Sequence, residues 1–196
     1  MDAQYDRAEY SREPTIEDLV ELCRHLNEAG VKYAVIGGFA VILNGYLRTT
    51  GDIDLLVDST IDNVSSIKKA LLYLPDQAIR EIKPQEVAQY SVVRVADEIV
   101  IDLIEKACGI TYEQAASYLQ YRETSGVLIP YLKPELLIKT KMTIRPKDHE
   151  DRLFLEKLLD SQQAESAQPS RSQNEFLDYM RRLMQSLRNW TVRKKQ

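Results

Sequence analysis

Apolar positions recur with two different periods in the first part of the chain. A helix is predicted after Thr15 and Asp18, which have capping-box spacing, and Gly30 marks its end. The apolar residues of this helix recur at helical spacing, at Ile16, Leu19, Val20, Cys23 and Leu26. A continuous apolar run predicts a buried strand at residues 33–36, and residues 39–46 indicate a short helix that is apolar on most sides.

The middle of the chain carries the remaining signals for regular structure. Strands are predicted at residues 52–58, 91–95, 99–104 and 127–132, and a tight turn at 96–98 joins the second to the third. Helices are predicted at residues 61–74, from 134 to about 144 and at 148–159, with Pro146 separating the last two. This mixture of helices and strands indicates an α+β fold, and we expect one compact domain over residues 1–160.

A different pattern follows the compact domain. Residues 161–173 have the composition of a linker, and Ser172 and Glu175 again have capping-box spacing. Residues 174–196 then predict a basic amphipathic helix with an apolar stripe, formed by Phe176, Met180, Leu183, Leu187 and Trp190. A detached helix of this kind buries its stripe either on its own domain or on a protein partner.

Composition narrows the class of protein. A chain of 196 residues with 44% hydrophobic and 29% charged residues is typical of one globular domain with an appendage. No apolar run approaches the ~18 residues of a membrane span, and two cysteines cannot form a disulfide framework. We therefore expect a cytoplasmic enzyme or binding protein that does not enter a membrane.

Charge is distributed unevenly around a net value of −4. Residues 1–30 hold three basic and eight acidic side chains, whereas residues 161–196 hold seven basic and three acidic ones. A modestly acidic chain is not a nucleic-acid binder by its overall field. The basic tail could contact a phosphate backbone or form a solvated face, and the second interpretation is the ordinary one.

Three aspartates carry the clearest chemical signal. Side chains alternate along a strand, so Asp52 and Asp54 point the same way, and like charges ~7 Å apart favour a cation between them. Asp102 lies within the apolar run of residues 99–104, where an ionised carboxylate needs a partner. Beside the first pair it would complete a site for two Mg²⁺ ions about 4 Å apart. Alternatively, Asp102 pairs with Arg48 or Arg94.

The residues around the first aspartate pair could serve a phosphate group. Gly37 and Gly38 follow a strand and precede a helix, where bare backbone N–H groups can meet an anion, although a plain tight turn has the same sequence. Arg48 and Thr50 come shortly before the acids. They would either contact phosphate or brace the loop.

These residues together resemble a known enzyme family. Gly-Gly-x-Ala from residue 37, Arg-x-Thr-x-Asp-x-Asp from residue 48, and a later strand aspartate are similar to the nucleotidyltransferase superfamily that shares the DNA polymerase β fold. More narrowly, they resemble the AbiEii-type nucleotidyltransferases, several of which are toxins of toxin–antitoxin systems. Residues 137–151 are similar to that family's downstream Lys…Arg-x-Lys-Asp-x-x-Asp element. The resemblance spans about residues 31–160.

The resemblance implies a fold and a role for each acid. It implies a nucleotidyltransferase fold, with a mixed β-sheet flanked by helices and a helical appendage after it. Asp52 and Asp54 would bind metal, and Asp102 would be the third carboxylate and the general base. Gly37 and Gly38 would cradle the triphosphate.

The resemblance also implies roles for the downstream charges. Lys141 would reach the charged oxygens of the triphosphate, with Lys139 as its rival for that role. Asp148 and Asp151 would orient Arg145 and Lys141, although a salt-bridged helix start explains them equally well.

The expected function is Mg²⁺-dependent transfer of a nucleoside monophosphate from an NTP to a hydroxyl acceptor. The acceptor could be a tRNA 3′ end, a protein or a small molecule, and a toxin role belongs to the same expectation. Two other classes remain open. One is a nucleotide-binding module without catalysis, and the other is an interaction protein that works through residues 174–196.

Overall fold

The computed structural model describes residues 11–167 and 180–182. Within that part, six strands form a mixed sheet in the order β3-β4-β2-β1-β8-β7. Their bounds are β1 Tyr33–Val35, β2 Ile53–Val57, β3 Val92–Ala96, β4 Val100–Ile104, β7 Leu119–Thr124 and β8 Val127–Leu132. β2 pairs with β4 and β1 with β8 in parallel, whereas the other neighbours are antiparallel. The predicted α+β fold with a mixed sheet is confirmed.

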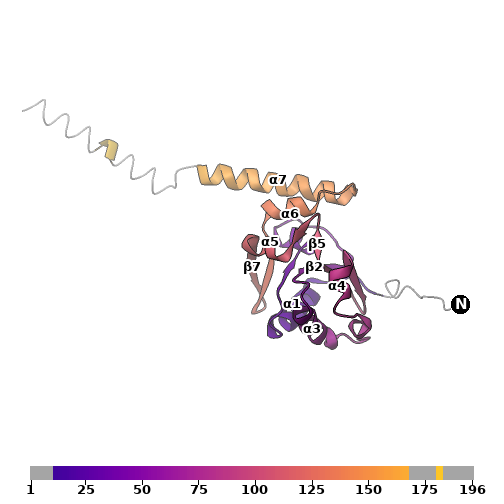
Figure 1. Ribbon diagram of the computed structural model, residues 1–196. Coiled ribbons are helices and arrows are strands. Elements are labelled where there is room, and N and C mark those ends of the chain that lie inside the picture. Colours follow the sequence, from indigo (N-terminus) through magenta and orange to yellow (C-terminus); the bar gives the residue numbers. More distant parts are fainter. Residues whose placement is uncertain (1–10, 168–179, 183–196) are drawn as a thin grey trace, which may run out of the picture. The chain divides into compact units, whose positions relative to one another are not determined.

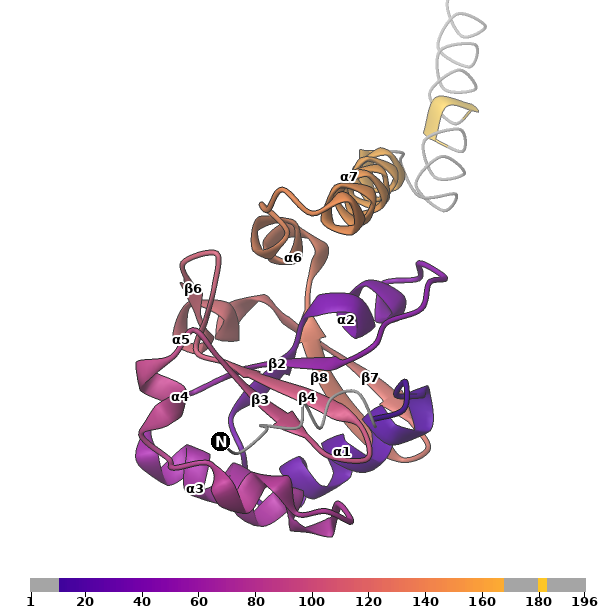
Figure 2. The same ribbon diagram turned by 90° about the vertical axis from the view of Figure 1, so that its right-hand side faces the viewer.

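Helices cover both faces of this sheet. The helix α1 (Ile16–Glu28) packs against α3 (Ile61–Ala70) on one face, and α2 (Gly37–Leu43) contacts α6 (Pro134–Thr140) on the other, as Figures 1 and 2 show. The strands between them supply fully buried side chains such as Leu55, Ile101 and Leu103. The sheet is therefore the centre of the hydrophobic core.

Several smaller elements complete the compact part. A second, two-stranded sheet consists of β5 (Lys106–Ala107) and β6 (Ile110–Thr111). Short helices are α4 (Glu86–Gln89), α5 (Tyr112–Ala115), and the 3-10 turns Leu71–Tyr73, Ala78–Glu81 and Ala116–Tyr118. Leu71–Tyr73 falls within the helix predicted at residues 61–74. The sequence pattern did not predict the other pieces, because segments of two to four residues are too short for a period to show.

Most predicted elements form with shifted ends. Thr15 and Asp18 make the predicted capping box, and the strand at 127–132 has the predicted bounds. The helix predicted at 39–46 begins at Gly37, so both glycines lie in its first turn. The helix predicted to reach residue 144 ends at Thr140. β-branched Thr143 and Ile144 disfavour its continuation, and Pro146 keeps the residue before it out of the helical conformation.

The last described helix extends into the predicted linker. α7 runs from Pro146 to Ala167, so residues 161–167 are helical. This segment holds Gln, Ala, Glu and Ser without Gly or Pro, and nothing in it ends a helix before position 169. The chain divides into two compact units, Met1–Glu156 and Lys157–Gln196. Met180–Arg182 are helical, and the rest of the predicted helix 174–196 lies outside the described residues.

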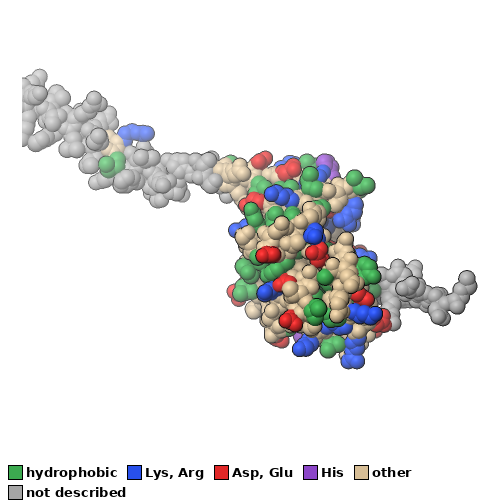
Figure 3. Space-filling view, viewed as in Figure 1, with side chains coloured by type: hydrophobic (Ala, Val, Ile, Leu, Met, Phe, Trp, Pro, Cys, Tyr) green, Lys and Arg blue, Asp and Glu red, His purple; other side chains and the backbone are tan. Residues whose placement is uncertain are grey.

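The surface is charged and mixed. Basic, acidic and apolar side chains are interspersed over the face of the first unit that Figure 3 shows, in keeping with the small net charge of −4. Among the described helices, none combines the length and the apolar character that crossing a membrane requires.

Candidate functional site

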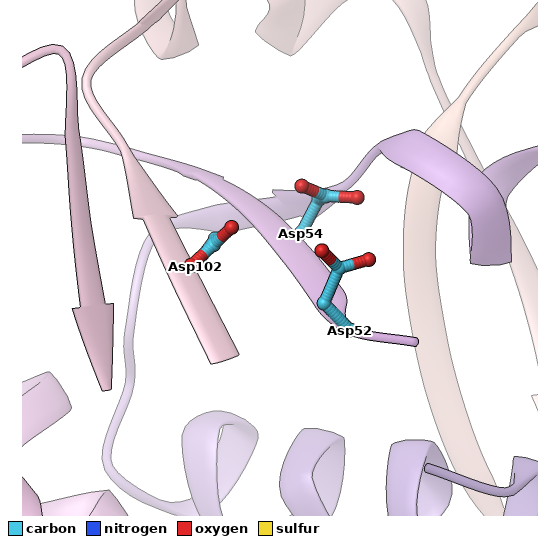
Figure 4. A group of neighbouring side chains, drawn as sticks. All are labelled: Asp52, Asp54 and Asp102. Carbon is cyan, nitrogen blue, oxygen red and sulfur yellow. The ribbon is translucent and has the colours of Figure 1, made fainter. Parts of the chain in front are cut away.

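The three predicted aspartates converge at one place on the sheet. Asp54 on β2 stands directly beside Asp102 on the parallel neighbour β4, and Asp52 immediately precedes β2. One carboxylate oxygen from each lies within 4.8 Å of the other two, and Figure 4 shows the three side chains gathered on the same side of the strands. Period-2 alternation explains the first pair, and strand pairing brings the third.

Gly37 makes room for the central carboxylate. A Cβ at this position would lie 1.7 Å from Asp54 Oδ2 and 2.8 Å from Asp54 Cβ, and the backbone φ is +60°. The backbone N–H of Ile36 donates to the Asp54 carbonyl at 3.0 Å, which holds the two segments together. Because Asp54 Cβ is fixed to the strand, a change of rotamer cannot relieve the whole overlap. Gly37 therefore provides the space that the Asp54 side chain occupies.

Replacing Gly37 with alanine should both destabilise the fold and displace Asp54. We expect Gly37→Ala to lower the free energy of unfolding by ~3 kcal/mol, from a positive φ together with the steric overlap. Gly30 is the matched control, because it has a similar φ of +64° with nothing within 4 Å. Gly30→Ala should cost about 1 kcal/mol. Equal losses for the two variants in urea unfolding would contradict the close approach.

Arg94 neutralises the third aspartate. The Nε and Nη2 atoms of Arg94 donate to Asp102 Oδ1 at 2.9 Å and Oδ2 at 2.7 Å, and Nη2 also lies 3.6 Å from Asp52 Oδ2. Asp102 is only 5% exposed, so it needs this counter-charge. The hydrogen bonds to Asp102 raise the pKa of the Arg94 guanidinium above its ordinary value. Of the two partners open from the sequence, the structure selects Arg94.

Among the described residues, none forms an ion pair of this kind with Asp54. Burial, followed by the charges of Asp52 and Asp102, raises the pKa of Asp54 from 3.8 to about 6, although Lys141 and Arg145 act in the opposite direction. A carboxylate that resists ionisation in this way gains from any cation that reaches it. The site therefore has an excess of negative charge at the position where the strands meet.

This raised pKa predicts a pH dependence of stability. Between about pH 4 and pH 6 the native state holds the Asp54 proton while the unfolded chain releases it, so this group lowers stability as pH rises. Without metal, the wild-type protein should lose about 2 kcal/mol more than Asp54→Asn does across that window. Urea unfolding of both proteins at about pH 4 and pH 7 measures the difference. Parallel losses in the two proteins would contradict the raised pKa.

A second charge cluster lies beside the carboxylates. Lys141, which is 5% exposed, places Nζ 3.2 Å from Asp148 Oδ1 and 3.0 Å from Asp151 Oδ2 on α7. Arg48 Nε approaches the other oxygen of Asp151 at 3.4 Å. The first two turns of α7 thus hold cations from two loops that are far apart in the sequence.

Arg145 differs from Lys141 in its exposure. Its Nε donates to Asp148 Oδ2 at 2.9 Å, yet 73% of its side chain remains exposed. Burial alone would raise the pKa of Asp148, but the Thr143 hydroxyl and then Lys141 and Arg145 outweigh it and hold that pKa below its usual value. Asp148 therefore remains ionised and orients Arg145 without enclosing it.

An open cleft of about 880 Å³ joins the two clusters. Nearly all the predicted site residues line it, namely Gly37, Gly38, Arg48, Thr50, Asp52, Asp54, Asp102, Lys141 and Arg145. Lys139 does not belong to this lining and is exposed on α6. Thr50 donates to Asp52 Oδ1 at 3.3 Å, and a Cβ on Gly38 would lie 2.3 Å from Thr50 Oγ1. Thr50 and Arg48 thus pack against the glycine turn.

The sequence interpretation missed some residues of the cleft. Lys106, Cys108 and Lys147 also line it. Lys106 and Cys108 lie on the β5–β6 hairpin, and Lys147 lies in the first turn of α7. Lys147 stands between Arg145 and Asp148, inside the motif that the resemblance drew on, and could have been found there. The hairpin has no comparable signal.

Comparisons with known proteins add a likeness in structure. The chain is similar to the crystal structure of a candidate nucleotidyltransferase from Thermotoga maritima, at 15% identity over 77% of this chain and 90% of that chain, with a TM-score of 0.44. No protein-family model matches the sequence, and no curated protein matches it. A likeness of this size carries no functional weight, so the function must be argued from the residues of the site.

Proposed function

We propose that this protein is a metal-dependent nucleotidyltransferase that moves an NMP from an NTP to a hydroxyl acceptor. The observation that carries the proposal is the cluster of Asp52, Asp54 and Asp102 within 4.8 Å, at the edge of a cleft that also exposes basic side chains. Nucleotidyl transfer needs both halves of this arrangement. The acidic side chains bind the metal ion, and the basic side chains contact the triphosphate.

The carboxylates fit divalent metal ions by their chemistry. Hard oxygen ligands are those that Mg²⁺ prefers, and it completes its shell with water and phosphate oxygens. A cation, the Arg94 guanidinium, already bridges Asp102 and Asp52, which shows that the pocket accepts positive charge there. Asp52, Asp54 and Asp102 would hold the metal, with two Mg²⁺ ions as the expected set. When bound, Mg²⁺ would activate the acceptor oxygen and neutralise charge on the triphosphate.

The chain's own groups would handle the proton and the phosphates. The acceptor oxygen forms a bond to the α-phosphorus while the bond to the bridging oxygen breaks and pyrophosphate leaves. The proton of the acceptor hydroxyl passes to Asp102, in the role that the family resemblance implies. Because Arg94 donates hydrogen bonds to both Asp102 oxygens, these two bonds must break before Asp102 can accept the proton.

Of the basic residues predicted from the sequence, Arg145 is best suited to meet the triphosphate. Its guanidinium is oriented by Asp148 yet mostly exposed, whereas the charge of Lys141 is shared between two buried carboxylates. Arg48 likewise faces Asp151. We therefore assign Arg145 to direct phosphate contact, and Lys141 and Arg48 to shaping the cleft. Lys139 has no assigned contact.

Labelled nucleotides test the proposal directly. The protein would be incubated with Mg²⁺ and each NTP, labelled at the α- or the γ-phosphate, together with total cellular RNA and protein. We expect α-label to enter an acceptor and γ-label to leave as pyrophosphate. Label that enters from the γ-position instead would identify a kinase and contradict nucleotidyl transfer. Tight NTP binding without turnover would favour the alternative of an inert nucleotide-binding module.

The proposed acceptors and a role as a toxin rest on the family resemblance alone. A tRNA 3′ end or a protein hydroxyl would use the same carboxylates, so the labelled product decides between them. A protein partner for residues 174–196 rests on the apolar stripe in the sequence.

A further inference from the structure

One contact stands where the proposed function requires a metal ion. Arg94 Nη2 lies 2.7 Å from Asp102 Oδ2 and 3.6 Å from Asp52 Oδ2, so it bridges two of the three carboxylates. We propose that Arg94 is an internal counter-ion that a divalent cation must displace from Asp102, and that Arg94 thereby sets the affinity of the metal site. This inference rests on the proposed function and adds a control on how its metal binds.

Competition follows from the geometry of the fork. A metal shared by Asp52 and Asp102 needs the oxygens that face one another, and Arg94 Nη2 already occupies the space between two of them. The metal ion and the Arg94 guanidinium would repel each other strongly at this separation, because a partly buried site screens charge less than water does. A bidentate guanidinium–carboxylate pair is also one of the strongest contacts that a single carboxylate makes. The metal therefore exchanges with Arg94 and does not add to it.

Arg94 has the freedom to leave. It lies on the edge strand β3, directly across from Asp102, and 52% of its side chain is exposed. Its long side chain can turn into solvent without disturbing the core. Asp102, in contrast, is buried and cannot follow. Arg94 can therefore leave the ion pair while Asp102 stays in place, as a displaceable counter-ion requires.

The same contact explains how the metal-free protein tolerates Asp102. A buried carboxylate without a partner destabilises the fold by several kcal/mol. Removing one member of a buried ion pair leaves the other charge uncompensated. Arg48, the other cation open from the sequence, faces Asp151 instead. Arg94 thus neutralises Asp102 until a metal takes over.

Direct measurement of Mn²⁺ binding to the full chain tests this inference. Isothermal titration would compare wild type with Arg94→Gln, Arg94→Lys and Arg122→Gln. Arg122 is the matched control, because it is an exposed arginine on β7, the opposite edge strand of the sheet. We expect Arg94→Gln to bind Mn²⁺ about tenfold more tightly, which corresponds to ~1.4 kcal/mol of relieved competition. Arg94→Lys should lie between, and Arg122→Gln should match wild type.

Thermal unfolding supplies a second readout that does not depend on activity. Arg94→Gln should unfold at a lower temperature than wild type without metal, because Asp102 is unpaired, and should recover more than wild type when Mn²⁺ is added. If Arg94→Gln proves too unstable to titrate, the affinity of Arg94→Lys decides, and it should exceed that of wild type.

The possible results separate the two proposals. Wild type that binds Mn²⁺ while both Arg94 variants bind equally or more weakly would show that Arg94 braces Asp102, and would overturn the counter-ion while leaving the proposed function standing. Absence of Mn²⁺ binding and of Mn²⁺-dependent stabilisation in every variant would remove the metal site itself, and both proposals with it.

Discussion

Asp54→Asn should reduce NMP transfer at least about 10³-fold while leaving the protein folded, because it removes a ligand from the centre of the proposed metal site. Asp54 is one of the three clustered carboxylates, and its pKa is raised to about 6. Asparagine keeps the shape and one oxygen but loses the charge. Initial rates of pyrophosphate release under saturating Mg²⁺ and NTP measure the effect.

An aspartate outside the site controls for general effects of this substitution. Asp62 lies in the first turn of α3 and is exposed, so Asp62→Asn should keep full turnover. The unfolding curve of Asp54→Asn should also show a native transition, at least as stable as wild type near pH 7. Turnover within threefold of wild type in Asp54→Asn would mean that the three carboxylates do not carry the chemistry.

Lys141→Met should lower the free energy of unfolding by about 3 kcal/mol, the second large effect, since it leaves two buried carboxylates without their shared cation. Asp148 and Asp151 are 2% and 1% exposed, and Lys141 Nζ lies within 3.2 Å of both. Arg145 and Arg48 hold the remaining oxygens and keep the loss from being larger. Urea unfolding near pH 7 measures this loss.

Lys139, two residues earlier on α6, is the natural comparison. Lys139 is exposed and lies outside the cleft lining, so Lys139→Met should change stability by less than about 0.5 kcal/mol and leave turnover unaffected. Equal losses in the two variants, or a larger loss for Lys139→Met, would contradict the assignment of Lys141 to the buried cluster.

The local sequence pattern was enough to predict two of the three clustered carboxylates. The alternation of a strand places Asp52 and Asp54 on one side, whatever surrounds them. That Asp102 joins them depends on β4 lying parallel to β2, and strand order is a tertiary property that the local period does not contain. The prediction for Asp102 therefore had to come from its buried charge and from the family resemblance.

The partner of Asp102 depends on the position of the hairpin turn between β3 and β4. A hairpin that turns at residues 97–99 places Arg94 across from Asp102, because each step away from the turn pairs one residue from either strand. The turn predicted at residues 96–98 would instead pair Arg94 with Val100, so the observed turn lies one residue further along the chain. β7 was different, since Leu119–Thr124 is an edge strand with mostly polar or exposed residues and shows no core-facing alternation.

The extent of α7 was underestimated for a related reason. Residues 161–167 are polar and small, a composition shared by linkers and by solvent-exposed helices. Helix propensity alone favours neither, and the preceding turns of α7 supply the nucleus that a separate segment would lack. Composition predicts a linker reliably only where Gly or Pro interrupts the chain.

The central claim is that Asp52, Asp54 and Asp102 bind divalent cations together with a nucleoside triphosphate. A crystal grown with Mn²⁺ and an NTP analogue that cannot be cleaved at the α-phosphorus tests it most directly, through the anomalous signal of manganese. We predict manganese within about 2.5 Å of oxygens from at least two of these aspartates, with the triphosphate in the same cleft. An analogue bound elsewhere, or a cleft whose aspartates hold no manganese beside it, would contradict the account.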